Sequence, residues 1–230
     1  MQQLDSDLWI TDSSLRFLGL EVGARMTVVR LPDSKLLLHS PVPATKELVR
    51  EINSLGVVTY LVAPNKLHHL YLGEWQRAYP EASTYVAPGL ETKRADLTIT
   101  GILGDEPEPE WKDVLDQVLV GGFPFANEVV FFHRPSSTLI ATDLAFNIHA
   151  NSPPMTRLFF RLAGIYERLA PTLLERLAVR DRTAFRQSLE RILEWPFERI
   201  VVAHGEVCEK GGREQLVQGY SWLFDKGRNT

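Results

Sequence analysis

Two adjacent histidines, His68 and His69, follow a short apolar run at residues 57–62 after five intervening residues. Two later apolar runs of the same kind end at Asp143 and at His204. Each run has the composition of a buried strand. Imidazoles and carboxylates at strand ends are the usual components of metal or catalytic sites in α/β proteins. The sequence therefore predicts one polar site at which these four side chains converge.

The bulk composition is that of a soluble globular protein. The chain has 230 residues, of which 44% are hydrophobic and 23% are charged, and this length suffices for one substantial core. The net charge of -4 gives no electrostatic reason to expect a nucleic-acid partner. Cys208 is the only cysteine, so an internal disulfide is excluded and any metal must be bound by nitrogen and oxygen.

The start of the chain predicts a location in the cytoplasm. Residues 1–7 are acidic and lack the basic start and apolar centre of a signal peptide. No apolar run approaches the ~20 residues that a membrane-spanning helix needs. We therefore expect a protein that does not associate with membranes.

Hydrophobic periodicity predicts alternating strands and helices. The expected strands are residues 8–10, 26–31, 36–39, 57–62, 84–86, 117–120, 128–133, 138–142 and 200–203. The expected helices are residues 45–55, 73–79, 90–94, 153–170, 171–178, 181–195 and 212–224, with Thr45 and Asp181 as N-caps. Residues 26–39 and 128–142 should each form an antiparallel hairpin.

This order of elements resembles the metallo-β-lactamase superfamily over roughly Trp9 to Phe224. The family has an H-x-H-x-D-H signature after a strand, then a lone His, an Asp that bridges two metals, and a His near the C-terminus. When His69 is aligned with the last His of the signature, His68 falls at the Asp position, and Pro64 and Lys66 fall at the two other His positions.

The remaining positions match the family in part. Residues 121–128, which correspond to the turn with the lone His, contain no histidine. Asp143 matches the bridging Asp, and His204 matches the C-terminal His. The three imidazoles of the family's first metal site are thus absent, whereas the second site is retained. The chain is similar to the uncharacterised subgroups of this superfamily, of the domain-of-unknown-function kind, that carry an altered signature.

The resemblance implies an αββα sandwich in which two mixed sheets are flanked by helices. It implies one domain over residues 1–230, with a helical insertion at about residues 153–180. That insertion carries arginines on an amphipathic pattern. Its alternative roles are a lid over the site, a homodimer contact, ordinary core packing, or contact with a membrane surface.

The resemblance also implies one metal ion, zinc before iron, held by His68, His69, Asp143 and His204. Such a site would activate a water for hydrolysis, with Asp143 as the catalytic residue. The favoured substrate class is a small ester or phosphoester. A histidine at position 68 removes one negative charge, which suits an anionic substrate such as a phosphoester or a carboxylate.

Two other functional hypotheses stay open. The first is a protein that keeps the fold but acts as an inactive binding or regulatory module. The second is an iron-dependent oxygenase. A separate structural alternative is that these residues bind no metal, because a strand-end Asp can cap a turn and a His can simply hydrogen-bond the backbone.

Five further polar residues are candidates for smaller roles. His39 ends a predicted strand and is expected to contact the substrate or support the ligands, and His149 is an outside candidate for an extra ligand. Asn65 can offer its carbonyl, and Lys66 can place its ammonium in the vacated first site. His133, at a hairpin turn, is expected to be exposed.

Overall fold

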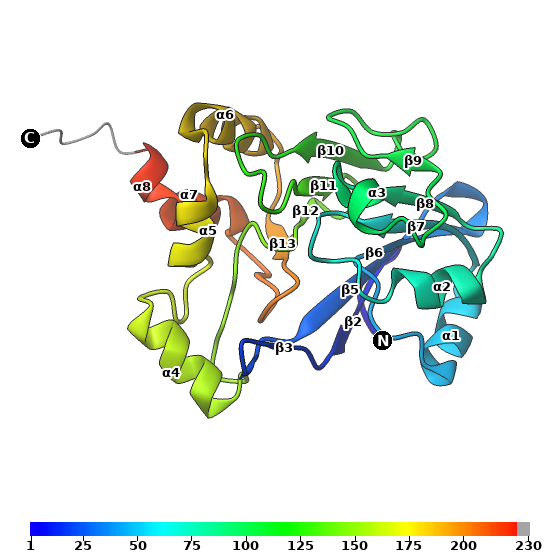
Figure 1. Ribbon diagram of the computed structural model, residues 1–230, viewed down its shortest axis with the longest axis horizontal. Coiled ribbons are helices and arrows are strands. Elements are labelled where there is room, and N and C mark those ends of the chain that lie inside the picture. Colours follow the sequence, from blue (N-terminus) through cyan, green and yellow to red (C-terminus); the bar gives the residue numbers. More distant parts are fainter. Residues whose placement is uncertain (225–230) are drawn as a thin grey trace, which may run out of the picture.

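Two β-sheets form the centre of the molecule (Figure 1). The computed structural model describes residues 1–224. The first sheet has seven strands in the order β1-β2-β5-β6-β7-β8-β9. These are β1 (Gln2–Asp5), β2 (Leu8–Ser13), β5 (Ala24–Arg30), β6 (Lys35–His39), β7 (Val57–Ala63), β8 (Ser83–Val86) and β9 (Gly101–Ile102). Strands from β1 to β6 pair antiparallel, and those from β6 to β9 pair parallel, so the sheet is mixed.

The second sheet has four strands in the order β10-β11-β12-β13. They are β10 (Leu115–Leu119), β11 (Val129–His133), β12 (Thr138–Ile140) and β13 (Arg199–Val201). Only the last pair, β12 with β13, is parallel. A separate two-stranded hairpin consists of β3 (Arg16–Phe17) and β4 (Leu20–Glu21).

The helices are α1 (Lys46–Asn53), α2 (Leu72–Ala78), α3 (Leu90–Lys93), α4 (Pro154–Leu162), α5 (Leu173–Ala178), α6 (Arg182–Ile192), α7 (Gly212–Gly219) and α8 (Ser221–Phe224). Helices α1 and α2 lie on the outer face of the first sheet, and α6 and α7 lie on the outer face of the second. Helix α4 lies apart from both sheets, near the short hairpin of β3 and β4 (Figure 1). A 3-10 turn, η1, spans Pro32–Ser34. The predicted N-caps are confirmed, because Thr45 accepts from the backbone of Leu48 and Asp181 accepts from Thr183 and Ala184.

Three hydrophobic clusters separate the four layers. Val62, Trp111 and Phe131 belong to the cluster between the two sheets. Ile52 and Trp75 pack with the outer face of the first sheet, and Phe185 and Leu189 pack with the outer face of the second. Because alternate side chains of a strand point to opposite faces, each sheet can bury both of its surfaces. The predicted αββα sandwich is confirmed.

Four short strands were not predicted from the sequence. These are β1, β9 and the pair β3 and β4, of which the last three have two residues each. A two-residue strand cannot show an alternating pattern, so its pairing depends on the surrounding structure. The predicted helix at 212–224 is divided into α7 and α8 at Tyr220. Among residues 1–224, no helix combines the length and apolar character needed to cross a bilayer.

The prediction that His133 is exposed is wrong. Its side chain is fully buried at the end of β11, and its Nδ1 lies 2.6 Å from the hydroxyl of Ser136. Its Nε2 has no hydrogen-bond partner. Burial lowers the pKa of His133 to about 4, although Asp5 and Asp7 act in the opposite direction. The hairpin turn itself is exposed, but the histidine just before it points into the protein.

Buried neutral His133 should make the fold sensitive to acid. The unfolded chain takes up this proton near pH 6.5 and the folded chain only near pH 4, so stability is present above pH 6.5 and declines as the pH falls toward 4. The contribution is on the order of 3 kcal/mol. Urea unfolding at pH 7 and pH 4.5 should therefore show a smaller loss for His133→Phe than for the wild type. Equal losses in the two proteins would contradict this assignment.

Candidate metal centre

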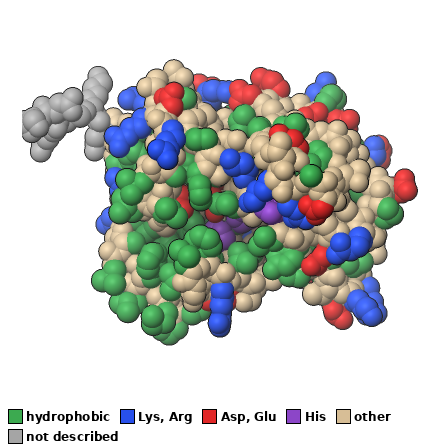
Figure 2. All heavy atoms as spheres, in the orientation of Figure 1, with side chains coloured by type: hydrophobic (Ala, Val, Ile, Leu, Met, Phe, Trp, Pro, Cys, Tyr) green, Lys and Arg blue, Asp and Glu red, His purple; other side chains and the backbone are tan. Residues whose placement is uncertain are grey.

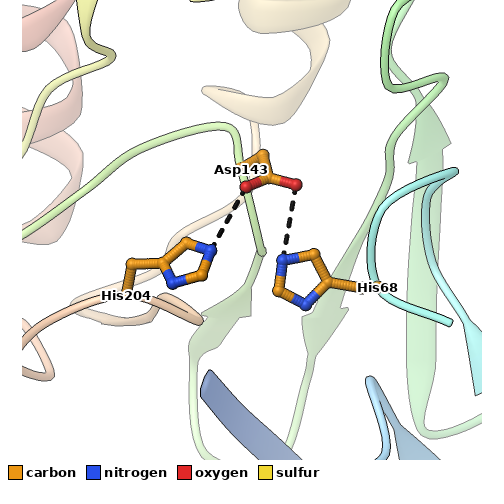
Figure 3. Close-up of side chains that lie close together, drawn as sticks. All are labelled: His68, Asp143 and His204. Carbon is orange, nitrogen blue, oxygen red and sulfur yellow. Dashed lines mark ion pairs between the residues drawn. The ribbon is translucent and has the colours of Figure 1, made fainter. Parts of the chain in front are cut away.

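Three chain segments that leave strands deliver the polar side chains of the site. His68 lies beyond the end of β7, Asp143 beyond β12 and His204 beyond β13. Strands β12 and β13 are parallel, so their carboxyl ends reach the same edge of the second sheet. The end of β7 in the first sheet faces that edge across the sandwich. Figure 3 shows Asp143 between the two imidazoles.

The three side chains are within reach of one another. Nε2 of His68 lies 3.4 Å from Oδ2 of Asp143, and Nε2 of His204 lies 3.3 Å from Oδ1 of Asp143. One ligand atom from each residue lies within 4.8 Å of the other two. The side chains are 6–7% exposed.

Hydrogen bonds to the opposite ring nitrogens orient both imidazoles. Nδ1 of His204 lies 2.8 Å from the backbone carbonyl oxygen of Gly23, which can only accept, so Nδ1 carries the hydrogen. Nδ1 of His68 lies 2.8 Å from the hydroxyl of Ser40. Each ring thus turns Nε2 toward Asp143, as metal-binding histidines do when a second group holds the other nitrogen.

This orientation brings acceptors face to face. With Nδ1 protonated, neutral His204 presents a lone pair on Nε2 to a carboxylate oxygen of Asp143. Two such groups repel at 3.3 Å unless a proton or a cation lies between them. The site therefore requires a positive charge at its centre.

The pKa shifts of Asp143 and His204 agree with a positive charge at the centre of the site. Burial by itself raises the pKa of Asp143, but the charges and hydrogen bonds of His68 and His204 outweigh it and hold the pKa well below its usual range. Burial likewise opposes protonation of His204, yet contact with Asp143 raises its pKa above the usual value. The carboxylate is ionised, and it stabilises a cation beside it.

Two buried residues around Asp143 fix its position. Asn65 is fully buried and donates from Nδ2 to Oδ2 of Asp143 at 2.7 Å and to the hydroxyl of Thr142 at 2.9 Å. Its Oδ1 accepts from the backbone N–H groups of Leu67 and His68, each at 2.8 Å. Asn65 thus joins the segment after β7 to the segment after β12. Its amide is a hydrogen-bond partner of the Asp143 carboxylate and of the His68 backbone.

Glu128 is a buried residue of the candidate site that the sequence analysis missed. Its carboxylate is fully buried and accepts from the backbone N–H groups of Thr142 at 2.6 Å and Asp143 at 2.9 Å. Burial, together with the nearby charge of Asp143, raises the pKa of Glu128 to about 8. The sequence did offer one signal, a single acidic residue directly before the apolar strand β11. An acid buried with such a strand needs hydrogen-bond donors around its carboxyl group.

The backbone on either side of His204 is closely fixed. Gly205 has a φ of 95°, and a Cβ there would lie 2.1 Å from the carbonyl oxygen of Asn147, so only glycine fits. The guanidinium of Arg25, 7% exposed, donates to the carbonyl oxygen of Val202 at 2.8 Å and pairs with Asp12. The ring of Phe146 stacks on His204 at 5.0 Å between centroids.

His69 lies outside the cluster of three. Its Nδ1 is 2.9 Å from a guanidinium nitrogen of Arg94, and the same nitrogen donates to the His69 carbonyl oxygen. Because a guanidinium only donates, Nδ1 of His69 accepts. Burial, followed by the charges of Lys93 and Arg94, lowers the pKa of His69 to about 4. The structure therefore brings together three of the four predicted ligands and holds His69 beside them as a neutral ring.

The three remaining candidates have separate partners. His39 is buried against Phe131 beneath the site, and burial, with the charge of His68, lowers its pKa to about 3. The ammonium of Lys66 donates to the carbonyl oxygen of Pro124. Nε2 of His149 lies 2.8 Å from the amide oxygen of Asn147. None of these three is in the cluster or lines the cavity described next.

A cavity of about 300 Å³ opens beside the cluster, and His68, His69, Asp143 and His204 all line it. Figure 2 shows histidine side chains at the centre of this face, with hydrophobic side chains gathered beside and below them. The three clustered residues are thus accessible to a small molecule.

The donor set fits one divalent ion. Two ligands of a tetrahedral ion at 2.0–2.1 Å lie roughly 3.4 Å apart. Nε2 of His68 lies 3.4 Å from Oδ2 of Asp143 and Nε2 of His204 lies 3.3 Å from Oδ1, so each histidine has this spacing to a different oxygen of the carboxylate. Two imidazoles and one carboxylate are a usual zinc set and leave a fourth position for water.

Comparisons with known proteins agree with this architecture. The pattern of the family described as "Domain of unknown function (DUF4336)" matches residues 5–163. The metallo-β-lactamase from Pontibacter korlensis is 16% identical, with a TM-score of 0.67 over 98% of each chain. The DIM-1 metallo-β-lactamase is 15% identical, with a TM-score of 0.67 over 98% of this chain and 96% of that one. No curated protein sequence matches. The predicted metallo-β-lactamase-like fold and its domain-of-unknown-function kind are confirmed.

Removing the Asn65 side chain should separate the two segments that it joins. Asn65→Ala leaves two backbone N–H groups and Asp143 without their partner, so we expect the free energy of unfolding to fall by about 2–4 kcal/mol. Chemical denaturation measures this loss. Asn151→Ala is the control, because its amide makes one exposed hydrogen bond to Glu206, and its cost should stay below about 0.5 kcal/mol. Equal costs for the two variants would show that Asn65 does not join the segments.

Proposed function

We propose that this chain, which belongs to the family described as "Domain of unknown function (DUF4336)" and has the metallo-β-lactamase fold, is a hydrolase that uses one metal ion. The proposed ligands are His68, Asp143 and His204. The observation that carries the proposal is the approach of a carboxylate and two Nε2 atoms whose rings are fixed from the other side.

The identity of the ion follows from the ligands. Two nitrogens and one oxygen suit zinc best, and iron is the second choice. His69 would become a fourth ligand only if its ring left Arg94, so we assign it to the cavity wall instead.

The chain's own residues would position the reactants. When bound, the ion supplies Lewis acidity that lowers the pKa of a water to about 7 and polarises a carbonyl or phosphoryl oxygen. Asp143 presents two oxygens, one toward each histidine, and one of them can orient the attacking water. Asn65 and Glu128 hold Asp143 in place from beneath, which limits reorganisation during the reaction. The cavity admits a small ester or phosphoester to this point.

A second candidate function is an inactive binding module, and one observation favours it. Nε2 of His204 lies 3.3 Å from Oδ1 of Asp143, so a proton can occupy the position of the cation and the cluster can also close as a His–Asp–His ion pair. Metal content separates the two functions.

Protein purified without chelator should contain about one equivalent of zinc per chain, measured by elemental analysis. His68→Ala and His204→Ala should lose it, since each removes one of three ligands. His149→Ala and His69→Gln should retain it, because neither residue is in the cluster. A folded wild-type protein that stays free of metal even after incubation with zinc would support the inactive module.

Hydrolysis should depend on the same three residues. The metal-loaded protein should hydrolyse an aryl ester, lose this activity with a chelator, and recover it with zinc. Asp143→Asn keeps the size of the side chain but removes its charge, so turnover should fall on the order of 10²–10⁴-fold. His149→Ala should keep the wild-type rate. A turnover rate of Asp143→Asn equal to that of the wild type would contradict the proposed role of Asp143 in hydrolysis.

A further inference from the structure

The wall of the cavity is mainly apolar outside the polar cluster. Its apolar lining residues are Leu15, Phe17, Val22, Ala24, Pro41 and Leu67, followed by Leu70, Tyr71, Phe125, Phe146 and Leu174. A polar substrate would gain little from such a wall, whereas a hydrocarbon group would leave water on entering it.

Large hydrophobic side chains at the mouth of the cavity are exposed to solvent. Phe17, Leu70, Phe125 and Leu174 line the cavity and are 44–56% exposed. They come from the β3–β4 hairpin, the segment after β7, the segment after β10 and helix α5. Four separate segments therefore direct apolar groups to one opening, which is typical of a ligand site.

The apolar surface continues from the opening onto α4. Phe146, which stacks on His204, also packs with buried Phe160 of α4. Met155, Leu158 and Phe159 of α4 are 47–68% exposed. A hydrogen bond from Thr156 to the carbonyl oxygen of Glu21 ties this helix to β4, next to the hairpin that carries Phe17. Figure 2 shows hydrophobic side chains over the part of the molecule where Figure 1 places α4.

The charged groups of the cavity already have partners within the protein. Lys93 donates to the carbonyl oxygen of Lys66 at 2.7 Å. Glu175 caps α5 by accepting from Thr172, and burial raises its pKa. Arg16 is 79% exposed at the rim and lies 3.6 Å from Glu21. Among the described lining residues, Arg16 and Lys93 are the lysines and arginines, and because both already have partners, a neutral reacting group fits the cavity better than a phosphate.

We propose that the substrate is a neutral carboxylic ester with an apolar acyl chain. This inference rests on the proposed hydrolase function and names its substrate class. The ester carbonyl would lie at His68, Asp143 and His204, with the acyl chain along Phe146 and Leu174 toward the mouth. The water oxygen bonds to the acyl carbon, and the bond from that carbon to the alcohol oxygen breaks. The alcohol oxygen takes the electron pair and a proton from the water, which gives a carboxylic acid and an alcohol.

Binding of straight-chain N-methyl amides with 4 to 12 acyl carbons tests the substrate class without hydrolysis. These amides are neutral analogues of the ester, and calorimetry with the protein as purified gives their Kd. Each added pair of methylenes should tighten binding about tenfold until the chain outgrows the wall. Phe17→Ser and Leu174→Ser should each weaken binding of the longer amides about tenfold.

Val217→Ser is the matched control. Val217 lies on α7, is 40% exposed, and does not line the cavity, so its loss should leave every Kd unchanged. A Kd independent of chain length, or an equal effect of Val217→Ser, overturns the proposal. So does tighter binding of alkyl phosphates than of amides of the same length, which would favour a phosphoester. Binding to phosphatidylcholine vesicles without binding to dispersed amides overturns it in favour of a membrane surface.

The two proposals fail separately in these experiments. A zinc-loaded protein whose amide affinity ignores chain length contradicts the substrate class alone. A protein that binds long amides but takes up no zinc contradicts the hydrolase alone.

Discussion

A buried carboxylate between two imidazoles is the interaction on which the rest of the site depends. Asp143 is 5% exposed and fully ionised, because His68 and His204 stabilise its charge more than burial opposes it. A buried charge of this kind is costly without a partner. The two imidazoles stabilise this charge, and hydrogen bonds at their Nδ1 atoms hold them in place. Nδ1 of His68 contacts the hydroxyl of Ser40, and Nδ1 of His204 contacts the carbonyl oxygen of Gly23.

The sandwich architecture makes this arrangement geometrically available. His68 follows a strand of the first sheet, while Asp143 and His204 follow neighbouring strands of the second. The large apolar cluster between the sheets fixes their relative position. Because the three residues leave a packed core, their backbones have little freedom. Two buried hydrogen bonds further restrict Asp143: its carboxylate accepts from Asn65, and its backbone N–H donates to Glu128.

The distribution of polarity gives the cavity two parts. Its floor carries one negative charge and two imidazoles, and its walls and mouth are built from aliphatic and aromatic side chains. Helices α4 and α5 expose several large hydrophobic side chains to water. Such groups are typical of surfaces that contact an apolar ligand. The segment that was predicted as a helical insertion at residues 153–180 contains both helices.

The fold and the approximate place of the site could be predicted from the sequence. Strand composition, helix caps and polar residues at strand ends are local signals, and they indicated the caps Thr45 and Asp181 and the edge where Asp143 and His204 meet. The sandwich was implied by the resemblance of the order of elements to a known superfamily. Which of two adjacent histidines enters the cluster is not a local property. Arg94 holds the ring of His69, whereas Ser40 and Asp143 hold His68, and these partners are distant in the chain. The burial of His133 and Glu128 likewise depends on which layers pack over them. Composition and periodicity thus determined the elements and their chemistry, but only the tertiary structure decided side-chain orientation, because hydrogen bonds between remote segments set it.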